Sequence, residues 1–176
     1  MNNNTSSKGK IAVTRNIIDW KQFKYISGVT YIYVLRHPAS GAICYVGQAS
    51  YPARRYNGHI AASKYGRTKS QLWVKGLRAE GYRPIMEIIM IIKDRFQLAN
   101  TMEVFFIRYF QETLDTLQNG NSYNYPKYNF FDGMNFGTDL PDLIESVVDR
   151  FASRDAMDSF DFEFLGIREN EAVRTP

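Results

Sequence analysis

The pattern of apolar and polar positions predicts a β-hairpin in the first third of the chain. The stretch 29–35, VTYIYVL, is rich in β-branched and aromatic residues, and the turn-forming RHPASG separates it from AICYVG at 42–47. A second apolar run, IMEIIMII at 85–92, predicts a central strand that is buried on most of its surface.

The alternation of side chains along a strand decides which hairpin residues lie together. Tyr31 and Tyr33 are two positions apart and therefore share one face of their strand, and Tyr45 shares its face with Gly47. We expect the tyrosines to cluster on one side of the hairpin.

Four segments have apolar residues at helical spacing. Ser50 is a candidate N-cap of the first, with Pro52 in the first turn, and Asn100 is a candidate N-cap of the third. The third is apolar almost all round, so we expect it in the core. The predicted helices cover residues 50–63, 69–80, 101–114 and 140–151.

Charge is distributed unevenly along the chain. The total of 22 basic and 18 acidic residues gives a net charge of +4, but residues 1–131 carry +11 and residues 132–176 carry −7. A basic body suggests a surface for a polyanion, and the acidic segment would cover that surface, compete for it or stay clear of it. On charge alone, solvated faces of both signs explain the pattern equally well.

Composition limits the compartment and the metal chemistry. A chain of 176 residues with 44% hydrophobic content can bury a core, and no stretch approaches the roughly 20 apolar residues of a membrane span. The lone Cys44 and the polar first ten residues favour a cytoplasmic protein with no membrane partner. One cysteine and two histidines are too few for a zinc site made only of Cys and His side chains.

Glu103 stands out because it shares a helical stripe with Phe106 and Phe110, where an unpaired charge is costly. One interpretation, which the pattern alone favours, is a capping box in which Asn100 and Glu103 satisfy the helix start. The other is a carboxylate at a cleft edge that holds a hard divalent cation, as Mg²⁺ prefers.

The hairpin tyrosines and Arg55 have two interpretations as well. Separately, cross-strand packing explains the tyrosines, and a solvated helix charge explains Arg55. Together, a phenol, a guanidinium and a carboxylate are the groups that phosphodiester cleavage needs for proton transfer, phosphate neutralisation and metal binding.

These residues lie in motifs that resemble the GIY-YIG nuclease superfamily. Tyr31-Ile32-Tyr33 matches the first motif, with tyrosine in place of the founding glycine, and Tyr45-Val46-Gly47 matches the second after 11 intervening positions. The further matches are Arg55, eight residues after the glycine, His59 one helical turn on, Glu103 within EVFFIRYF and Asn129 within YNFFDG. The resemblance covers about residues 29–137.

The resemblance implies an α/β domain of the α+β type, with a three-stranded antiparallel sheet flanked by helices, that hydrolyses DNA with one Mg²⁺ or Mn²⁺. It divides the chain into an N-terminal arm at 1–28, partly mobile, a nuclease-like domain at 29–137 and an acidic helical C-terminal extension at 138–176. The implied roles are a general base or water-orienting group for Tyr33, support for Tyr45, phosphate binding for Arg55, proton transfer or phosphate contact for His59, metal ligation for Glu103 and bracing of the site for Asn129.

Candidate DNA contacts outside these motifs come from the basic body. They are Tyr31 and the positively charged Lys64, Arg67, Lys69 and Lys75, which are interleaved with Tyr65 and Trp73. Such a surface tracks phosphates without reading sequence.

Three functional hypotheses follow. The first is a metal-dependent endonuclease that cuts double-stranded or branched DNA, as a monomer or a homodimer. The second is a non-catalytic nucleic-acid-binding or regulatory protein on the same fold. The third is a protein-interaction domain whose acidic-aromatic segment at 158–163, DSFDFE, recruits a partner.

Overall fold

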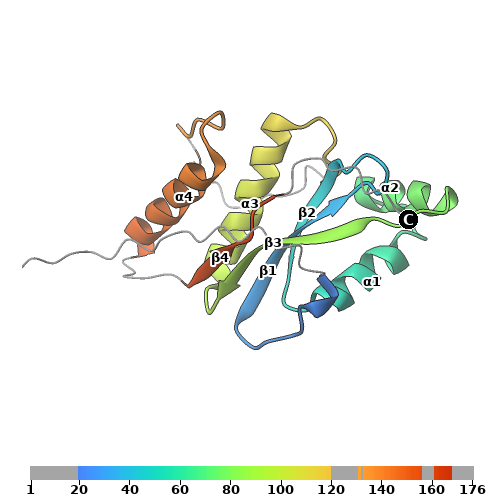
Figure 1. The fold of residues 1–176 in the computed structure, drawn as a ribbon, viewed down its shortest axis with the longest axis horizontal. Helices are drawn as coiled ribbons and strands as arrows, with labels where there is room; N and C mark the ends of the chain where they lie inside the picture. The colour runs from blue at the N-terminus through green and yellow to red at the C-terminus, as the bar shows by residue number, and fades with distance from the viewer. Residues whose placement is uncertain (1–19, 120–130, 132, 156–160, 168–176) are drawn as a thin grey trace, which may run out of the picture.

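The computed structural model describes residues 20–119, 131, 133–155 and 161–167 (Figure 1). These residues form a mixed α/β fold. Its elements in chain order are η1 (Trp20–Gln22), β1 (Val29–Arg36), β2 (Ile43–Ala49), α1 (Pro52–Ala62), α2 (Lys69–Ala79), β3 (Ile85–Lys93), α3 (Phe96–Thr113), α4 (Leu140–Asp155) and β4 (Phe162–Phe164).

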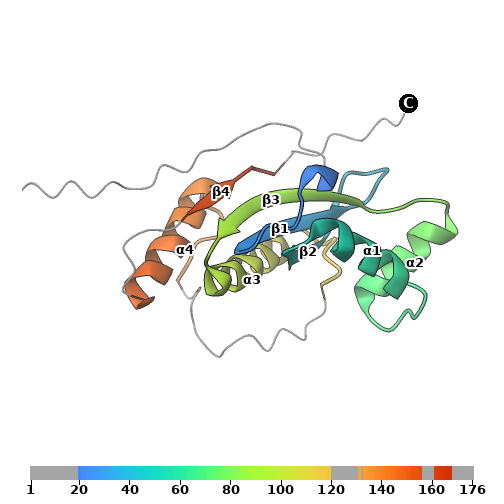
Figure 2. The same cartoon turned by 90° about the horizontal axis from the view of Figure 1, so that it is seen from below.

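The sheet is antiparallel, with the strand order β2-β1-β3-β4 (Figure 2). The predicted hairpin is β1 and β2, and the predicted central strand is β3, between β1 and β4. The expectation of three strands was wrong, because β4 adds a fourth through pairing of Phe162 with Ile92 and of Phe164 with Met90. A strand of three residues carries too little alternation to be recognised within an acidic segment.

The two faces of the sheet belong to two different apolar clusters. Ile32 and Val34 of β1 pack with the buried side of α3, whereas Tyr31, Tyr33 and Leu35 pack with residues of η1 and α1 on the other face. The alternation of strand side chains thus places the three predicted tyrosines, Tyr45 included, in one cluster, as the sequence indicated.

Two predicted helix caps were wrong. Helix α1 begins at Pro52, and its N-cap is Tyr51, which makes no side-chain cap hydrogen bond, so Ser50 is not the cap. Helix α3 begins at Phe96 directly after the turn at Asp94, which leaves Asn100 inside the helix and excludes the capping box with Glu103. That turn has a positive φ of 51° at Asp94, a conformation that neither helical nor strand periodicity reveals.

The segment after α3 covers the outer edge of β2. The Asn119 side chain accepts from the backbone N–H of Val46 and donates to its carbonyl, each at 2.9 Å, and the Gln118 N–H donates to the Cys44 carbonyl. An edge strand otherwise leaves its backbone groups unpaired. The second tyrosine motif is therefore held from both sides, by β1 and by residues 116–119.

Helix α4 lies beside α3, and its apolar side is part of the core. Its buried residues are Leu143, Ile144, Val147 and Phe151. In the part of the chain that the structure describes, no helix combines the length and the apolar character needed to cross a membrane.

Candidate active site

The hydroxyl of Tyr33 is the centre of a polar cluster. It lies 2.7 Å from His59 Nε2 and accepts a hydrogen bond of 3.1 Å from Arg55 Nε. Strand β1 supplies Tyr33, which is fully buried, and helix α1 supplies the other two residues from one side of the helix. The cluster thus joins a phenol, an imidazole and a guanidinium.

Gly47 makes room for this arrangement. A Cβ at this position would lie 2.4 Å from Tyr33 Oη and 2.9 Å from the Tyr45 ring. Any side chain here would therefore displace the phenol. The Tyr45 ring packs beside the cluster, with its centroid 4.9 Å from that of His59.

Burial sets the protonation states of the cluster. It raises the pKa of Tyr33 far above the ordinary value of a phenol, with the neighbouring Tyr45 contributing in the same direction. Burial also lowers the pKa of His59 to about 4, assisted by the positive charge of Arg55. At neutral pH a neutral phenol therefore donates to a neutral imidazole, and this hydrogen bond assigns the acceptor to Nε2 and the ring proton to Nδ1.

We expect His59 to make the free energy of unfolding depend on pH. Between the ordinary pKa of about 6.5 and the folded value of about 4, the unfolded state binds the proton and the folded state does not, so stability falls as pH drops through this range. Urea unfolding at pH 7 and at pH 4.5 measures this dependence. Between these two pH values the free energy of unfolding of His59→Gln should fall by about 2 kcal/mol less than that of the native chain. Equal losses would contradict a neutral, half-buried His59.

Glu103 lies on the opposite side of the sheet, on α3, and only 4% of its surface is exposed. Burial raises its pKa, whereas the hydrogen bond from Gln48 and the charge of Arg55 lower it. The Gln48 Nε2 donates to Glu103 Oε2 at 2.9 Å and also to Asn100 Oδ1. Gln48 follows Gly47 on β2, so this amide places the carboxylate next to the end of the second motif.

The donors around Glu103 fit a hard divalent cation. Among the described residues, Gln48 Oε1 is a buried oxygen without a hydrogen-bond partner. The amide cannot be flipped, because Nε2 donates to two acceptors, Glu103 Oε2 and Asn100 Oδ1. A carboxylate and an amide oxygen are the protein ligands that Mg²⁺ takes, with water and phosphate completing its shell. In the same part of the chain no three His, Cys, Asp or Glu residues gather, so such a site would rest on few protein oxygens.

Glu103 and the Tyr33 cluster are coupled by charge. The carboxylate contributes to the raised pKa of Tyr33, and Arg55 stabilises the ionised carboxylate. No hydrogen bond joins the two groups directly among residues 20–119. Arg55 therefore lies where it can act on both.

The remaining predicted residues lie outside this cluster. Tyr31 is only 2% exposed and donates its hydroxyl to the Lys24 carbonyl at 3.0 Å, which gives it a packing role. Exposed basic side chains gather where α1 meets α2, with Lys64 and Arg67 against the Tyr65 ring; they are Lys64, Arg67, Lys69 and Lys75. Asn129 lies outside the described residues.

The fold and this cluster define a class of protein: a small α/β domain with a phenol, an imidazole and a guanidinium joined by hydrogen bonds on one face of its sheet. A family model described as the GIY-YIG catalytic domain matches residues 29–116, half of the chain. The chain belongs to the GIY-YIG family, and this membership implies nuclease activity in general. Neither the curated proteins nor the solved structures compared with the chain gave a match.

Gln48 and Asn100 are the site residues that sequence reasoning missed. Asn100 was interpreted as a cap, and Gln48 had no motif of its own. The available signal was position: Gln48 directly follows the second motif, and alternation directs it to the face of the sheet opposite Tyr45, where α3 lies.

Proposed function

We propose that this protein is a metal-dependent DNA endonuclease whose site comprises Tyr33, Tyr45, Arg55, His59 and Glu103. The observation that carries the proposal is the hydrogen-bonded link from Arg55 through the Tyr33 hydroxyl to His59, within a GIY-YIG domain. It joins a phosphate-binding group to a route for a proton.

Tyr33 and His59 manage the proton of the attacking water. The water gives a proton to Tyr33 Oη while the phenol proton passes to His59 Nε2, which is neutral and accepts it. The water oxygen bonds to phosphorus, the bond to the leaving oxygen breaks, and that oxygen takes a proton from solvent. Tyr45 keeps the imidazole in place by ring packing.

Arg55 controls access to this route. Tyr33 is fully buried, whereas Arg55 is an exposed residue on α1. When the guanidinium turns to the scissile phosphate, it uncovers the hydroxyl and neutralises the phosphate charge. Substrate binding and proton transfer are then linked.

Glu103 and Gln48 would hold the divalent cation. When bound there, Mg²⁺ or Mn²⁺ supplies Lewis-acid stabilisation of negative charge on the phosphate group. The buried carboxylate keeps its position through Gln48, and the charge of Arg55 favours its ionised form.

The substrate is DNA, and the exposed Lys64, Arg67, Lys69 and Lys75 provide the phosphate contacts beside the site. Lysines and arginines at a surface contribute affinity that does not depend on sequence and falls with salt.

A digest series tests the proposal. We expect the full chain to nick or cut supercoiled, linear or branched DNA with Mg²⁺, and to lose this activity with excess EDTA. Gel analysis of nicks and ends measures both. DNA binding without cleavage across Mg²⁺, Mn²⁺ and all three DNA forms would contradict the proposal and favour the non-catalytic alternative.

A further inference from the structure

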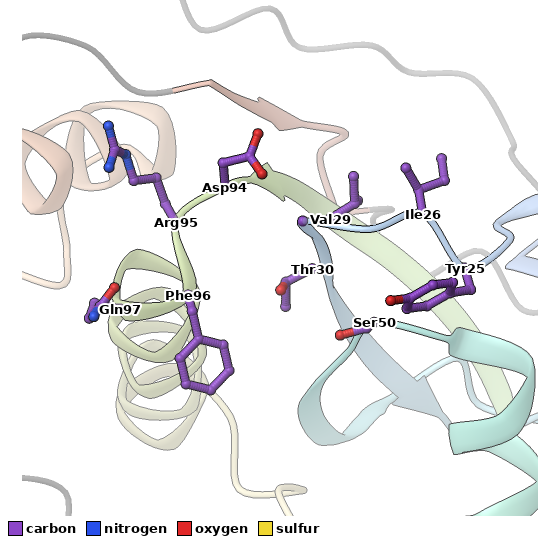
Figure 3. A pocket seen from close by; sticks show the side chains of 10 residues that line it. Tyr25, Ile26, Val29, Thr30, Ser50, Asp94, Arg95, Phe96 and Gln97 are labelled. Carbon is purple, nitrogen blue, oxygen red and sulfur yellow. The ribbon is translucent and has the colours of Figure 1, made fainter.

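A cavity outside the Tyr33 cluster lies where the start of β1, the end of β2 and the start of α3 meet (Figure 3). Its volume is about 370 Å³, which is within the range of pockets that hold small ligands. No residue of the proposed proton route lines it.

The walls of the cavity are aromatic and its floor is polar. Tyr25 and Phe96 are 61% and 64% exposed, large fractions for aromatic side chains, and in Figure 3 they lie on either side of Thr30 and Ser50. Within the described part of the chain, neither hydroxyl makes a side-chain hydrogen bond. Flat apolar walls with free hydroxyls between them suit a planar ligand that carries donors and acceptors.

The rim carries a carboxylate and a guanidinium, from Asp94 and Arg95, and the Asp94 carboxylate packs closely against Gly28. The Asp94 N–H donates to the Gly28 carbonyl at 2.7 Å, and a Cβ on Gly28, whose φ is +77°, would lie 2.1 Å from Asp94 Oδ1. Only glycine therefore permits this contact of carboxylate and backbone. A carboxylate at the rim repels a phosphate but accepts hydrogen bonds from the N–H groups of bases.

The cavity is close to the proposed metal site. Gln97 on its wall precedes Asn100 by about one turn of α3 and Glu103 by about two, a rise of about 9 Å. Ser50 follows Gln48 by two residues. At a rise of about 3.4 Å per nucleotide, this distance is less than three steps along a DNA strand.

We propose that this cavity binds one unstacked nucleobase of the DNA substrate, held between Tyr25 and Phe96 and hydrogen-bonded to the hydroxyls of Thr30 and Ser50. The inference rests on the proposed function. Stacking on aromatic side chains is a general means of holding unpaired bases, and enzymes also extrude bases from duplexes. The base comes either from a strand that is already single or from a duplex that the protein opens.

The test measures binding by fluorescence anisotropy, with the full chain in EDTA so that no DNA is cut. The probes are a 12-nucleotide dT strand, an abasic strand of the same length, an intact duplex and a duplex with one bulged nucleotide. The variants are Tyr25→Ala and Phe96→Ala, with circular dichroism to confirm folding. Tyr82→Ala is the matched control, because Tyr82 is 47% exposed and does not line the cavity.

We expect each cavity variant to bind the dT strand about 5- to 100-fold more weakly, and the abasic strand within about twofold of the native chain, because only the base contacts the rings. Tyr82→Ala should bind like the native chain. If the cavity variants bind the bulged duplex more weakly but the intact duplex unchanged, the cavity captures a base that is already unpaired. If they bind both duplexes more weakly, the protein extrudes the base.

Equal losses on dT and abasic strands, or no loss at all, would overturn the nucleobase site. If the native chain still cleaves plasmid in that case, the proposed function survives and only the cavity proposal fails. A native chain that binds none of the four probes would overturn the proposed function, and with it the cavity proposal.

Discussion

Glu103→Gln is expected to lower Mg²⁺-dependent DNA cleavage by about 1,000-fold or more, since loss of a cation that stabilises the transition state removes several kcal/mol. The substitution keeps the size of the side chain and an oxygen for the Gln48 amide. It removes the charge that would attract the cation. Because a buried charge is costly, the variant should be at least as stable as the native chain.

Plasmid nicking rates measure this loss, and Mn²⁺ binding followed by electron paramagnetic resonance measures the cation separately. Glu112→Gln is the control, because Glu112 is an exposed carboxylate on the same helix. Cleavage and Mn²⁺ binding that persist in Glu103→Gln would exclude Glu103 as the ligand.

The long elements of this fold could be predicted from local sequence. The hairpin and β3 follow from runs of β-branched and apolar residues bounded by turn residues, and α1, α2 and the core of α3 follow from a period of about 3.6 residues. The start of α3 could not be predicted, because the left-handed turn at Asp94 depends on its contact with Gly28, which is 66 residues away in the sequence. Contacts between distant segments leave no periodic signal.

The candidate site divides in the same way. Motif spacing places Tyr33, Arg55 and His59 together, and the structure has them in hydrogen-bond contact. Motif spacing could not show that Glu103 approaches from the other face of the sheet and contacts Gln48, because that contact depends on the packing of α3 on β2. The roles of these residues remain proposals that the variants test.

Net charge alone misdescribes the acidic segment. Its negative residues suggested a part that covers the basic surface, competes for it or stays clear of it. The structure adds that α4 buries Ile144 and Val147 in the core beside α3, and that β4 extends the sheet. A helix can carry an acidic exposed side and an essential apolar side at once. Deleting this segment would expose core residues, so its effect on DNA binding has to be tested by neutralising exposed carboxylates such as Glu145.

Arg55→Ala is expected to reduce cleavage about 100- to 1,000-fold, the loss typical of one donor that stabilises transition-state charge. Arg55→Lys keeps the charge but not the planar fork that donates to Tyr33 Oη, so it should recover only part of the activity. Single-turnover rates on plasmid measure both.

Arg54→Ala is the matched control, because Arg54 is the exposed neighbour on α1 and should keep the native rate. If Arg54→Ala loses as much activity as Arg55→Ala, the helix contributes general positive charge to DNA binding, and the link from phosphate to Tyr33 is wrong. A loss confined to Arg55 connects phosphate binding to the proton route through a single side chain.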